Sequence, residues 1–284
     1  TGEMVTDYLV NREDQFSDFT YVLDGQGYTL TNNTATASLI KTLPASGAIR
    51  NLTIAGTMRS SSETENVELA AFVHTVSGGS IEDCTNEMGF EVSAKTVLFG
   101  AFARTITAGQ IVRCVNNADM TIMMDVTKAT TEDLKTIKSF GGGLVATCFS
   151  PTALVLVEDC VNNGDVNVTI DAGTAAGVNR AGFAGILGYV SGSTTENYPR
   201  LVNCTNNGNI SSTADSIAKE SFAMAGITGR MNPGAEVLCE NLVNNGNLTH
   251  NGTCKGLTIG GINPCECFIK KDRCSISNLL LCSK

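Results

Sequence analysis

The 284-residue sequence has no tryptophan, five prolines and two histidines, and only 17% of its residues are charged. Acidic residues outnumber basic ones by 28 to 19, which gives a net charge of −9. A chain with this balance lacks the basic surface that nucleic acids and anionic membranes require. The sequence also contains no run of about 18 apolar residues, so it predicts no membrane-spanning helix.

The sequence lacks the cysteine spacings that mark a zinc site or a secreted disulfide framework. Its eleven cysteines are an odd number, and no two of them form a C-x-x-C pair. With only His74 and His250 in the chain, a cysteine nucleophile has few candidate bases. The sequence therefore predicts mainly buried thiols. Disulfides within 239–282 and a metal site remain alternatives, and no cofactor is expected.

A short phrase recurs along the chain and defines a repeat. "EDCTNEMG", "VRCVNNAD", "EDCVNNGD" and "VNCTNNGN" each place a cysteine two residues before an asparagine. We call the cysteine position the slot. Leucine or cysteine occupies it at irregular intervals of 30 to 46 residues, in Leu52, Cys84, Cys114, Cys160, Cys204, Leu242 and Cys274.

A second phrase, rich in glycine and alanine, precedes most slots. Examples are "AGFAGILGYVSG" and "FAMAGITGRM". One unit therefore consists of a Gly-rich strand, a loop, a strand that ends at the slot, an Asn turn and an alternating strand such as "DVNVTI". Three short strands in each unit predict an all-β, single-stranded parallel β-helix of about seven irregular coils. Helical repeats fit badly, because the segments are β-branched and alternating.

The repeat predicts a single domain over residues 1–284. Residues 1–45 are expected to form the first coil or an N-terminal cap, with "YVLDGQGYTL" as a strand, a turn and a strand. Residues 46–262 form the repeat coils, and 263–284 form a last coil or a C-terminal cap. Capped ends are needed because an open coil exposes strand edges and core.

The slot residues and the recurring asparagines have structural interpretations. Cysteine alternates with leucine in the slot, which predicts an inward-facing packing column. The asparagines can form a hydrogen-bonded ladder at a tight corner, where Asn and Gly also accept positive φ. A row of ligand-binding amides is the alternative. The predicted ladder consists of Asn86, Asn116, Asn162, Asn206 and Asn244.

Catalytic and ligand-binding candidates are few. Asp119, Asp165 and Asp171 are the carboxylates that a carbohydrate-active β-helix could use, but Asn209 stands at the position that corresponds to Asp119 and Asp165. This interchange favours turn chemistry, so no catalytic residue is assigned. Tyr189 and Tyr198 are the best aromatic pair for a sugar ligand, and they remain weak candidates.

The phrases "DCVNNGDV", "NCTNNGNI" and "LVNNGNL", with preceding segments such as "AGFAGILG" and "MAGITG", resemble repeats of large surface and secreted β-solenoids of Bacteroides-type gut bacteria. Those proteins are related to the GLUG-repeat proteins, and the resemblance covers about residues 20–275. It implies a right-handed parallel β-helix that is exported, often as a lipoprotein, with an adhesive or glycan-related role. Leu52, Leu242 and Met88 depart from the repeat pattern. The first residues, "TGEMVTDYLV", do not resemble a secretion signal.

The sequence therefore favours a non-enzymatic, extracellular or cell-surface β-solenoid that binds a glycan, a host or matrix protein, or another partner protein. One alternative is a carbohydrate-active β-helix enzyme, a polysaccharide lyase or glycoside hydrolase. Another is a structural spacer of a larger surface protein. The oligomeric state is left open by the sequence.

Overall fold

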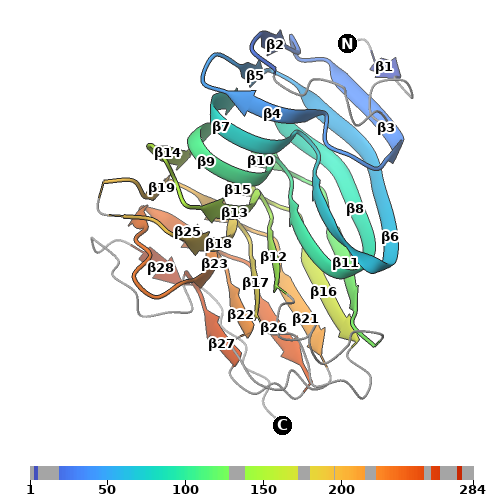
Figure 1. The fold of residues 1–284 in the computed structure, drawn as a ribbon, viewed down its shortest axis with the longest axis vertical. Helices are drawn as coiled ribbons and strands as arrows, with labels where there is room; N and C mark the ends of the chain where they lie inside the picture. Colours follow the sequence, from blue (N-terminus) through green and yellow to red (C-terminus); the bar gives the residue numbers. More distant parts are fainter. Residues whose placement is uncertain are drawn as a thin grey trace.

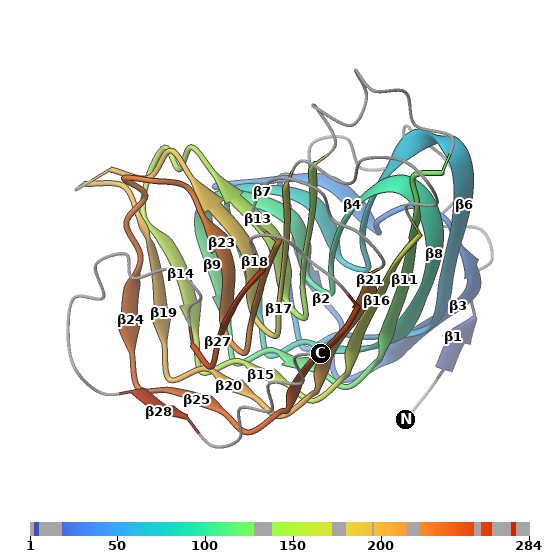
Figure 2. The same cartoon turned by 90° about the horizontal axis from the view of Figure 1, so that it is seen from below.

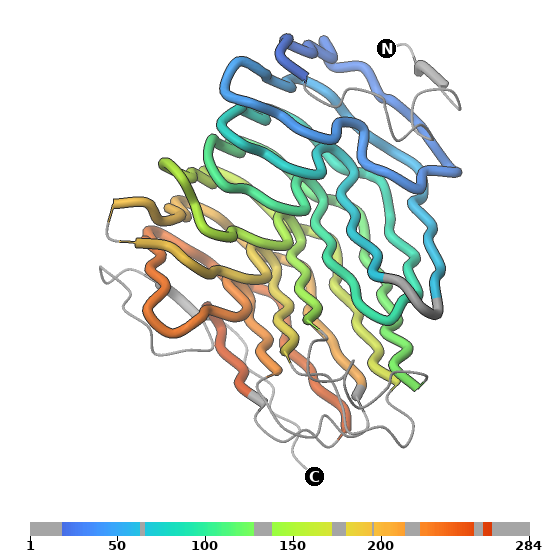
Figure 3. Tube along the Cα trace, in the orientation of Figure 1, coloured from blue at the N-terminus to red at the C-terminus, as the bar shows by residue number. Residues whose placement is uncertain are grey.

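The chain forms a parallel β-helix, as the repeat predicts (Figure 1). The computed structural model describes residues 3–5, 19–127, 138–171, 180–194, 196–214, 222–252, 257–262 and 274–276. Successive coils lie one above another from the N-terminal to the C-terminal part of the chain (Figure 3). Within the described residues, strands pair in parallel with the strands one coil away, in two sheets.

The first sheet contains the Asn turns and the strands that follow them. The early strands of this sheet are long. In the later coils three short strands take the place of one long strand, as the pairing of β8 with β10, β11 and β12 shows. In chain order the strands are β1 (Glu3–Val5), β3 (Thr29–Ala35), β6 (Thr53–Ala70), β8 (Thr85–Gly100), β10 (Val115–Asn116), β11 (Met120–Asp125), β12 (Lys138–Gly142), β15 (Val161–Asn162), β16 (Val166–Asp171), β17 (Arg180–Ala184), β20 (Thr205–Asn206), β21 (Ile210–Ala214), β22 (Phe222–Ala225), β25 (Leu242–Asn244), β26 (Leu248–Asn251), β27 (Leu257–Gly260) and β28 (Cys274–Ile276).

The second sheet forms the other side of each coil (Figure 2). It also changes from long strands to short ones, since β9 pairs with both β13 and β14. Its strands are β2 (Val22–Asp24), β4 (Ile40–Pro44), β5 (Ala48–Arg50), β7 (Val73–Glu82), β9 (Ala103–Val112), β13 (Val145–Phe149), β14 (Val155–Glu158), β18 (Leu187–Ser191), β19 (Pro199–Val202), β23 (Thr228–Met231) and β24 (Leu238–Glu240). The strand–turn–strand expected in "YVLDGQGYTL" corresponds to β2 and β3.

The Gly-rich phrase is two strands, where the sequence predicts one. In "AGFAGILGYVSG", β17 of the first sheet ends at Ala184 and β18 of the second begins at Leu187. A Cβ on Gly185 would lie 2.2 Å from the Asn206 side chain and 2.4 Å from the Gly226 carbonyl oxygen. Only glycine fits here, because the backbone at Gly185 turns from one sheet to the other in direct contact with the ladder asparagine of the next coil.

The left-handed corner of each coil lies one residue before the slot, not at the ladder asparagine. Six non-glycine residues directly before a slot have φ between 52° and 54°, which is the left-handed region: Asn51, Asp83, Arg113, Asp159, Asn203 and Asn241. The expectation that Asn at the ladder position provides positive φ is therefore wrong. The corner uses Asn or Asp at five of its six positions, since these residues tolerate this conformation best.

Six of the slot residues are buried in the predicted inward column: Leu52, Cys84, Cys114, Cys160, Cys204 and Leu242. Their positions follow the register of the first sheet coil by coil, and Leu242 pairs directly with Cys274. The thiols of four successive coils are at most 1% exposed. Each thiol donates to the carbonyl two residues earlier, for example Cys160 Sγ to the Glu158 oxygen at 3.1 Å. The buried cysteines of this column are Cys84, Cys114, Cys160 and Cys204, and none is in a disulfide.

The five predicted ladder asparagines are fully buried and hydrogen-bonded along the helix axis. The first four donate from Nδ2 to the Oδ1 of the asparagine in the next coil, as Asn116 does to Asn162 and Asn162 to Asn206, both at 2.7 Å. The same Nδ2 also donates to a carbonyl two residues ahead, such as Gly164 for Asn162 at 2.8 Å. The carboxamide thus satisfies its own donors and closes the turn of its coil.

We expect Asn162→Ala to lower the free energy of unfolding by about 2–4 kcal/mol. The substitution leaves a buried donor of Asn116 and buried acceptors of Asn206 and Gly164 without partners. Asn163→Ala is the matched control, because its exposed carboxamide bonds only to the neighbouring coils. It should change stability by no more than about 0.5 kcal/mol. Urea unfolding of both variants checks this, and equal losses would contradict a dominant role for the buried ladder.

The buried thiols give a second prediction. Burial raises the pKa of Cys148 to about 12 and the pKa of Cys114 above its ordinary value, so these side chains are protonated near neutral pH. In the native protein we expect no labelling of Cys148 or of the four slot cysteines Cys84, Cys114, Cys160 and Cys204 by a thiol reagent at pH 8. In denaturant all of them should react. Peptide mapping by mass spectrometry assigns each site, and native labelling of Cys160 would refute the packing column.

Candidate functional site

The candidate site is a polar surface that we call the outer face. It lies on the solvent side of β6, β8, β11, β16, β21 and β26, where inward and outward side chains alternate. Two columns point outward in register from coil to coil. The first column is Arg59, Glu91, Thr121, Asn167, Ser211 and Thr249. The second column is Ser61, Ser93, Met123, Thr169, Thr213 and Asn251.

One end of the outer face is hollowed. A shallow depression is lined by Arg59, Ser61, Glu91, Ser93, Thr121 and Met123, together with backbone of the same strands. Arg59 Nε and Nη2 donate to the Glu91 carboxylate at 2.8 and 3.3 Å. Both side chains stay more than half exposed, and Met123 is 40% exposed beside them. The depression thus combines a fixed ion pair, hydroxyl groups and one apolar side chain.

The carboxylates named as catalytic candidates lie in turn hydrogen bonds next to this face. Asp119 Oδ1 accepts from the Asp165 amide at 2.8 Å, and Asp165 accepts in the same way from Asn209 at 2.7 Å. Asp171 ends β16 and pairs in register with Asp125 of β11. Asp119 and Asp165 therefore have the turn chemistry that their interchange with asparagine suggests.

A cluster of charged side chains joins the two sheets. Glu68 projects from β6, whereas His74 and Arg104 come from β7 and β9; we call these three residues the junction cluster. Arg104 Nη2 lies 2.6 Å from Glu68 Oε2. His74 Nε2 lies 3.4 Å from the same oxygen and 3.3 Å from Arg104 Nε. A protonated imidazole therefore donates to Glu68, and a neutral one accepts from Arg104.

The junction cluster contains the residue types of a catalytic site but not its full geometry. The hydrogen bond from His74, followed by the charge of Arg104, lowers the pKa of Glu68. Glu68 is therefore an anion near neutral pH and a poor general acid. Hydrolysis of a glycosidic bond uses two carboxyl groups, whereas the side chains that set the pKa of Glu68 are His74 and Arg104.

The two tyrosines proposed for a sugar ligand differ in exposure. Tyr189 is 6% exposed and its ring stacks on Phe140 at 4.0 Å, with 6° between the planes. Tyr198 is half-buried just before β19. Tyr189 therefore has little exposed ring for stacking on a sugar, and the role of both tyrosines as ligand contacts stays a prediction.

A buried polar pair was not expected from the sequence. Ser212 Oγ lies 2.7 Å from His250 Nδ1, and both residues are at most 5% exposed. Val168 holds the same position one coil earlier, which shows that a polar pair replaces aliphatic packing here. His74 also has partners that sequence reasoning missed, because Glu68 and Arg104 belong to other strands.

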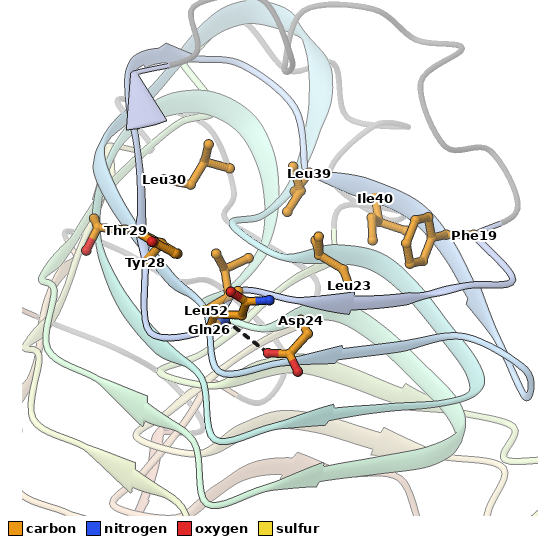
Figure 4. A pocket seen from close by; sticks show the side chains of 11 residues that line it. Phe19, Leu23, Asp24, Gln26, Tyr28, Thr29, Leu30, Leu39, Ile40 and Leu52 are labelled. Atoms are coloured by element: carbon orange, nitrogen blue, oxygen red, sulfur yellow. Dashed lines mark hydrogen bonds between the residues drawn. The ribbon is translucent and has the colours of Figure 1, made fainter. Parts of the chain in front are cut away.

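The N-terminal end of the helix has an apolar hollow (Figure 4). Leu30, Leu39, Ile40 and Leu52 line it and also belong to the hydrophobic core. Asp24 stands at its edge, where the carboxylate accepts from the Gln26 amide at 3.0 Å. The hollow is thus an extension of the core at the end of the coil stack, as expected of a solenoid end.

The described residues lack both a metal-binding cluster and a helix able to span a membrane. They contain no group of three or more His, Cys, Asp or Glu side chains arranged to hold a metal ion. No helix among them is long and apolar enough to cross a membrane.

Comparison with known proteins supports the fold. No family model matches the chain, and no curated protein matches it. Among solved structures it resembles the crystal structure of a putative immunoglobulin A1 protease from Bacteroides ovatus, with a TM-score of 0.55 and 16% identity. The match covers 87% of this chain and 75% of that one. At this identity the likeness shows a shared architecture and not a shared activity.

The buried His250 predicts that stability falls in acid. Burial lowers the pKa of His250, so the unfolded chain binds a proton more readily than the folded one. Its contribution to stability is complete above the unfolded pKa of about 6.5 and decreases as the pH falls below it. His250→Leu should remove this component. Urea midpoints of the wild type and of His250→Leu at pH 7.5 and 5.5 check it, and an unchanged pH dependence in His250→Leu would contradict it.

Proposed function

We propose that the chain is a non-enzymatic binding solenoid of an exported or cell-surface protein, and that it holds a glycan or a partner protein against the outer face. The observation that carries this proposal is the outer face itself. It extends over six strands in register and consists mainly of short polar side chains, whose backbone is held by pairing with the neighbouring strands. Such a surface offers many weak contacts with little loss of conformational entropy on binding.

The surface location is supported by the resemblance to exported solenoids and by the architecture shared with a Bacteroides protein. The free cysteines are compatible with a location outside the cell. The thiols of Cys84, Cys114, Cys160 and Cys204 are buried, and a thiol that solvent cannot reach reacts slowly with oxidants. A spacer within a larger protein would use the same coils, but it would have no ligand.

A carbohydrate-active enzyme is the second candidate, and the junction cluster is the observation that favours it. Glu68, His74 and Arg104 converge between the sheets, and a lyase or hydrolase site uses residues of these types. The low pKa of Glu68 weakens this alternative, because the carboxyl group is a poor general acid.

The test compares the chain with a variant of the outer face. The wild-type protein is applied to a glycan array and to a panel of host matrix proteins. We expect selective binding that the double substitution Thr169→Arg, Thr213→Arg abolishes, because bulky cations then stand in the second column. Thr152→Arg places a single arginine on an exposed residue after β13 of the second sheet and should leave binding intact.

The same preparations are incubated with polysaccharides and assayed for reducing ends and unsaturated sugars. Release of either product by the wild type, lost in Glu68→Gln, would overturn the non-enzymatic proposal in favour of the enzyme. Binding that survives in the outer-face variant would overturn the assignment of the site. Failure to bind any ligand would favour the spacer.

A further inference from the structure

We infer that the outer face binds a neutral, hydroxyl-rich polysaccharide, with the depression around Arg59, Glu91 and Met123 as its main contact site. This inference rests on the proposed function and names the ligand class of that site. Its argument is the charge of the face, the chemistry of the depression and the spacing of the columns.

The charge of the outer face differs from that of the whole chain. The chain has a net charge of −9, whereas the only formal charges of the two columns are Arg59 and Glu91, which pair with each other. An anionic polymer would be repelled by the chain and would find its one arginine here already paired. Within the two columns a basic peptide would find only Glu91, and this carboxylate is already paired with Arg59. A neutral polymer encounters neither penalty.

The remaining side chains of the face suit a polyol. Apart from the ion pair and Met123, both columns consist of hydroxyl and carboxamide groups, which donate and accept hydrogen bonds. Sugar hydroxyls have the same two capacities. A neutral polysaccharide can therefore exchange its water contacts for contacts with the face without leaving a charge unpaired.

The depression offers the strongest contacts on this surface. The two hydrogen bonds between Arg59 and Glu91 hold guanidinium and carboxylate side by side, and both groups remain more than half exposed. The guanidinium has further N–H donors and the carboxylate further lone pairs. Neighbouring sugar hydroxyls can accept from one group and donate to the other. Met123 lies close enough to give an apolar contact to the C–H groups of the ring.

The columns also supply a regular path. Adjacent strands lie about 4.8 Å apart, and alternate residues along a strand lie about 6.6 Å apart. The six strands from β6 to β26 therefore present a lattice of polar groups about 24 Å long. An extended polymer can follow it, with the ion pair and Met123 at one end.

The experiment is affinity electrophoresis in native gels that contain one soluble polysaccharide. The neutral probes are dextran, xyloglucan, galactomannan and mixed-linkage β-glucan, and the anionic probes are polygalacturonate and chondroitin sulfate. We expect at least one neutral polymer to retard the protein, with no retardation by the anionic ones. The double substitution Glu91→Gln, Met123→Ser should weaken that binding about tenfold or more, since it removes a hydrogen-bonded charge and the apolar contact.

The matched control is Arg113→Asn. Arg113 forms a comparable exposed ion pair with Asp83, at 2.6 Å between Nε and Oδ1, but this pair lies at the coil corner and outside the outer face. Asparagine is accepted at its left-handed φ of 52°. The control should bind as the wild type does. Circular dichroism of all three proteins establishes that the fold is unchanged.

Several results would overturn the inference. They are retardation by anionic polymers only, equal binding by the Glu91→Gln, Met123→Ser variant, and no retardation by any probe. If a matrix protein instead binds the wild type and not the Thr169→Arg, Thr213→Arg variant, the neutral-glycan inference fails and the proposed function stands. If no ligand of any class depends on the outer face, both fail.

Discussion

The buried carboxamide ladder is the interaction on which the rest of the structure depends. Asn86, Asn116, Asn162 and Asn206 each donate to the asparagine of the following coil at 2.7 to 2.8 Å. A buried amide that loses its partner costs more than an ordinary hydrogen bond contributes, so the coils are held to one register. The same register aligns the thiol column two residues earlier, because fixing the strand register at one position also fixes it at the neighbouring positions.

This register is transmitted to the surface. Successive residues of a strand face opposite sides, so an inward column of hydrophobic residues implies an outward column at the alternate positions. The core column Met120, Val166, Ile210 and Leu248 is followed along the strands by the first column of the outer face. The order of the binding surface is thus a consequence of the core and not of contacts among the exposed side chains, of which only a few exist.

Repetition explains what the sequence predicted and what it missed. The slot and the ladder were found because each coil repeats them, and the structure confirms the parallel β-helix and the asparagine ladder. The left-handed corner before the slot does have a signal in the sequence, since Asn or Asp occupies five of its six positions. Arg113 interrupts that pattern, and the ladder asparagines three residues later are equally good candidates for positive φ. The junction cluster and the Ser212–His250 pair occur once each. Their partners are brought together by coil stacking, so no local pattern in the sequence marks them.

The same physics separates the two candidate functions. A general acid must hold its proton near the working pH, yet the partners of Glu68 stabilise its charged form and tie one sheet to the other. The junction cluster therefore stabilises the fold with the groups that a reaction would need. The outer face has the opposite character, because its side chains are exposed, mostly uncharged and not required by the core. Coils that can vary such residues without loss of stability provide a surface on which binding specificity can evolve.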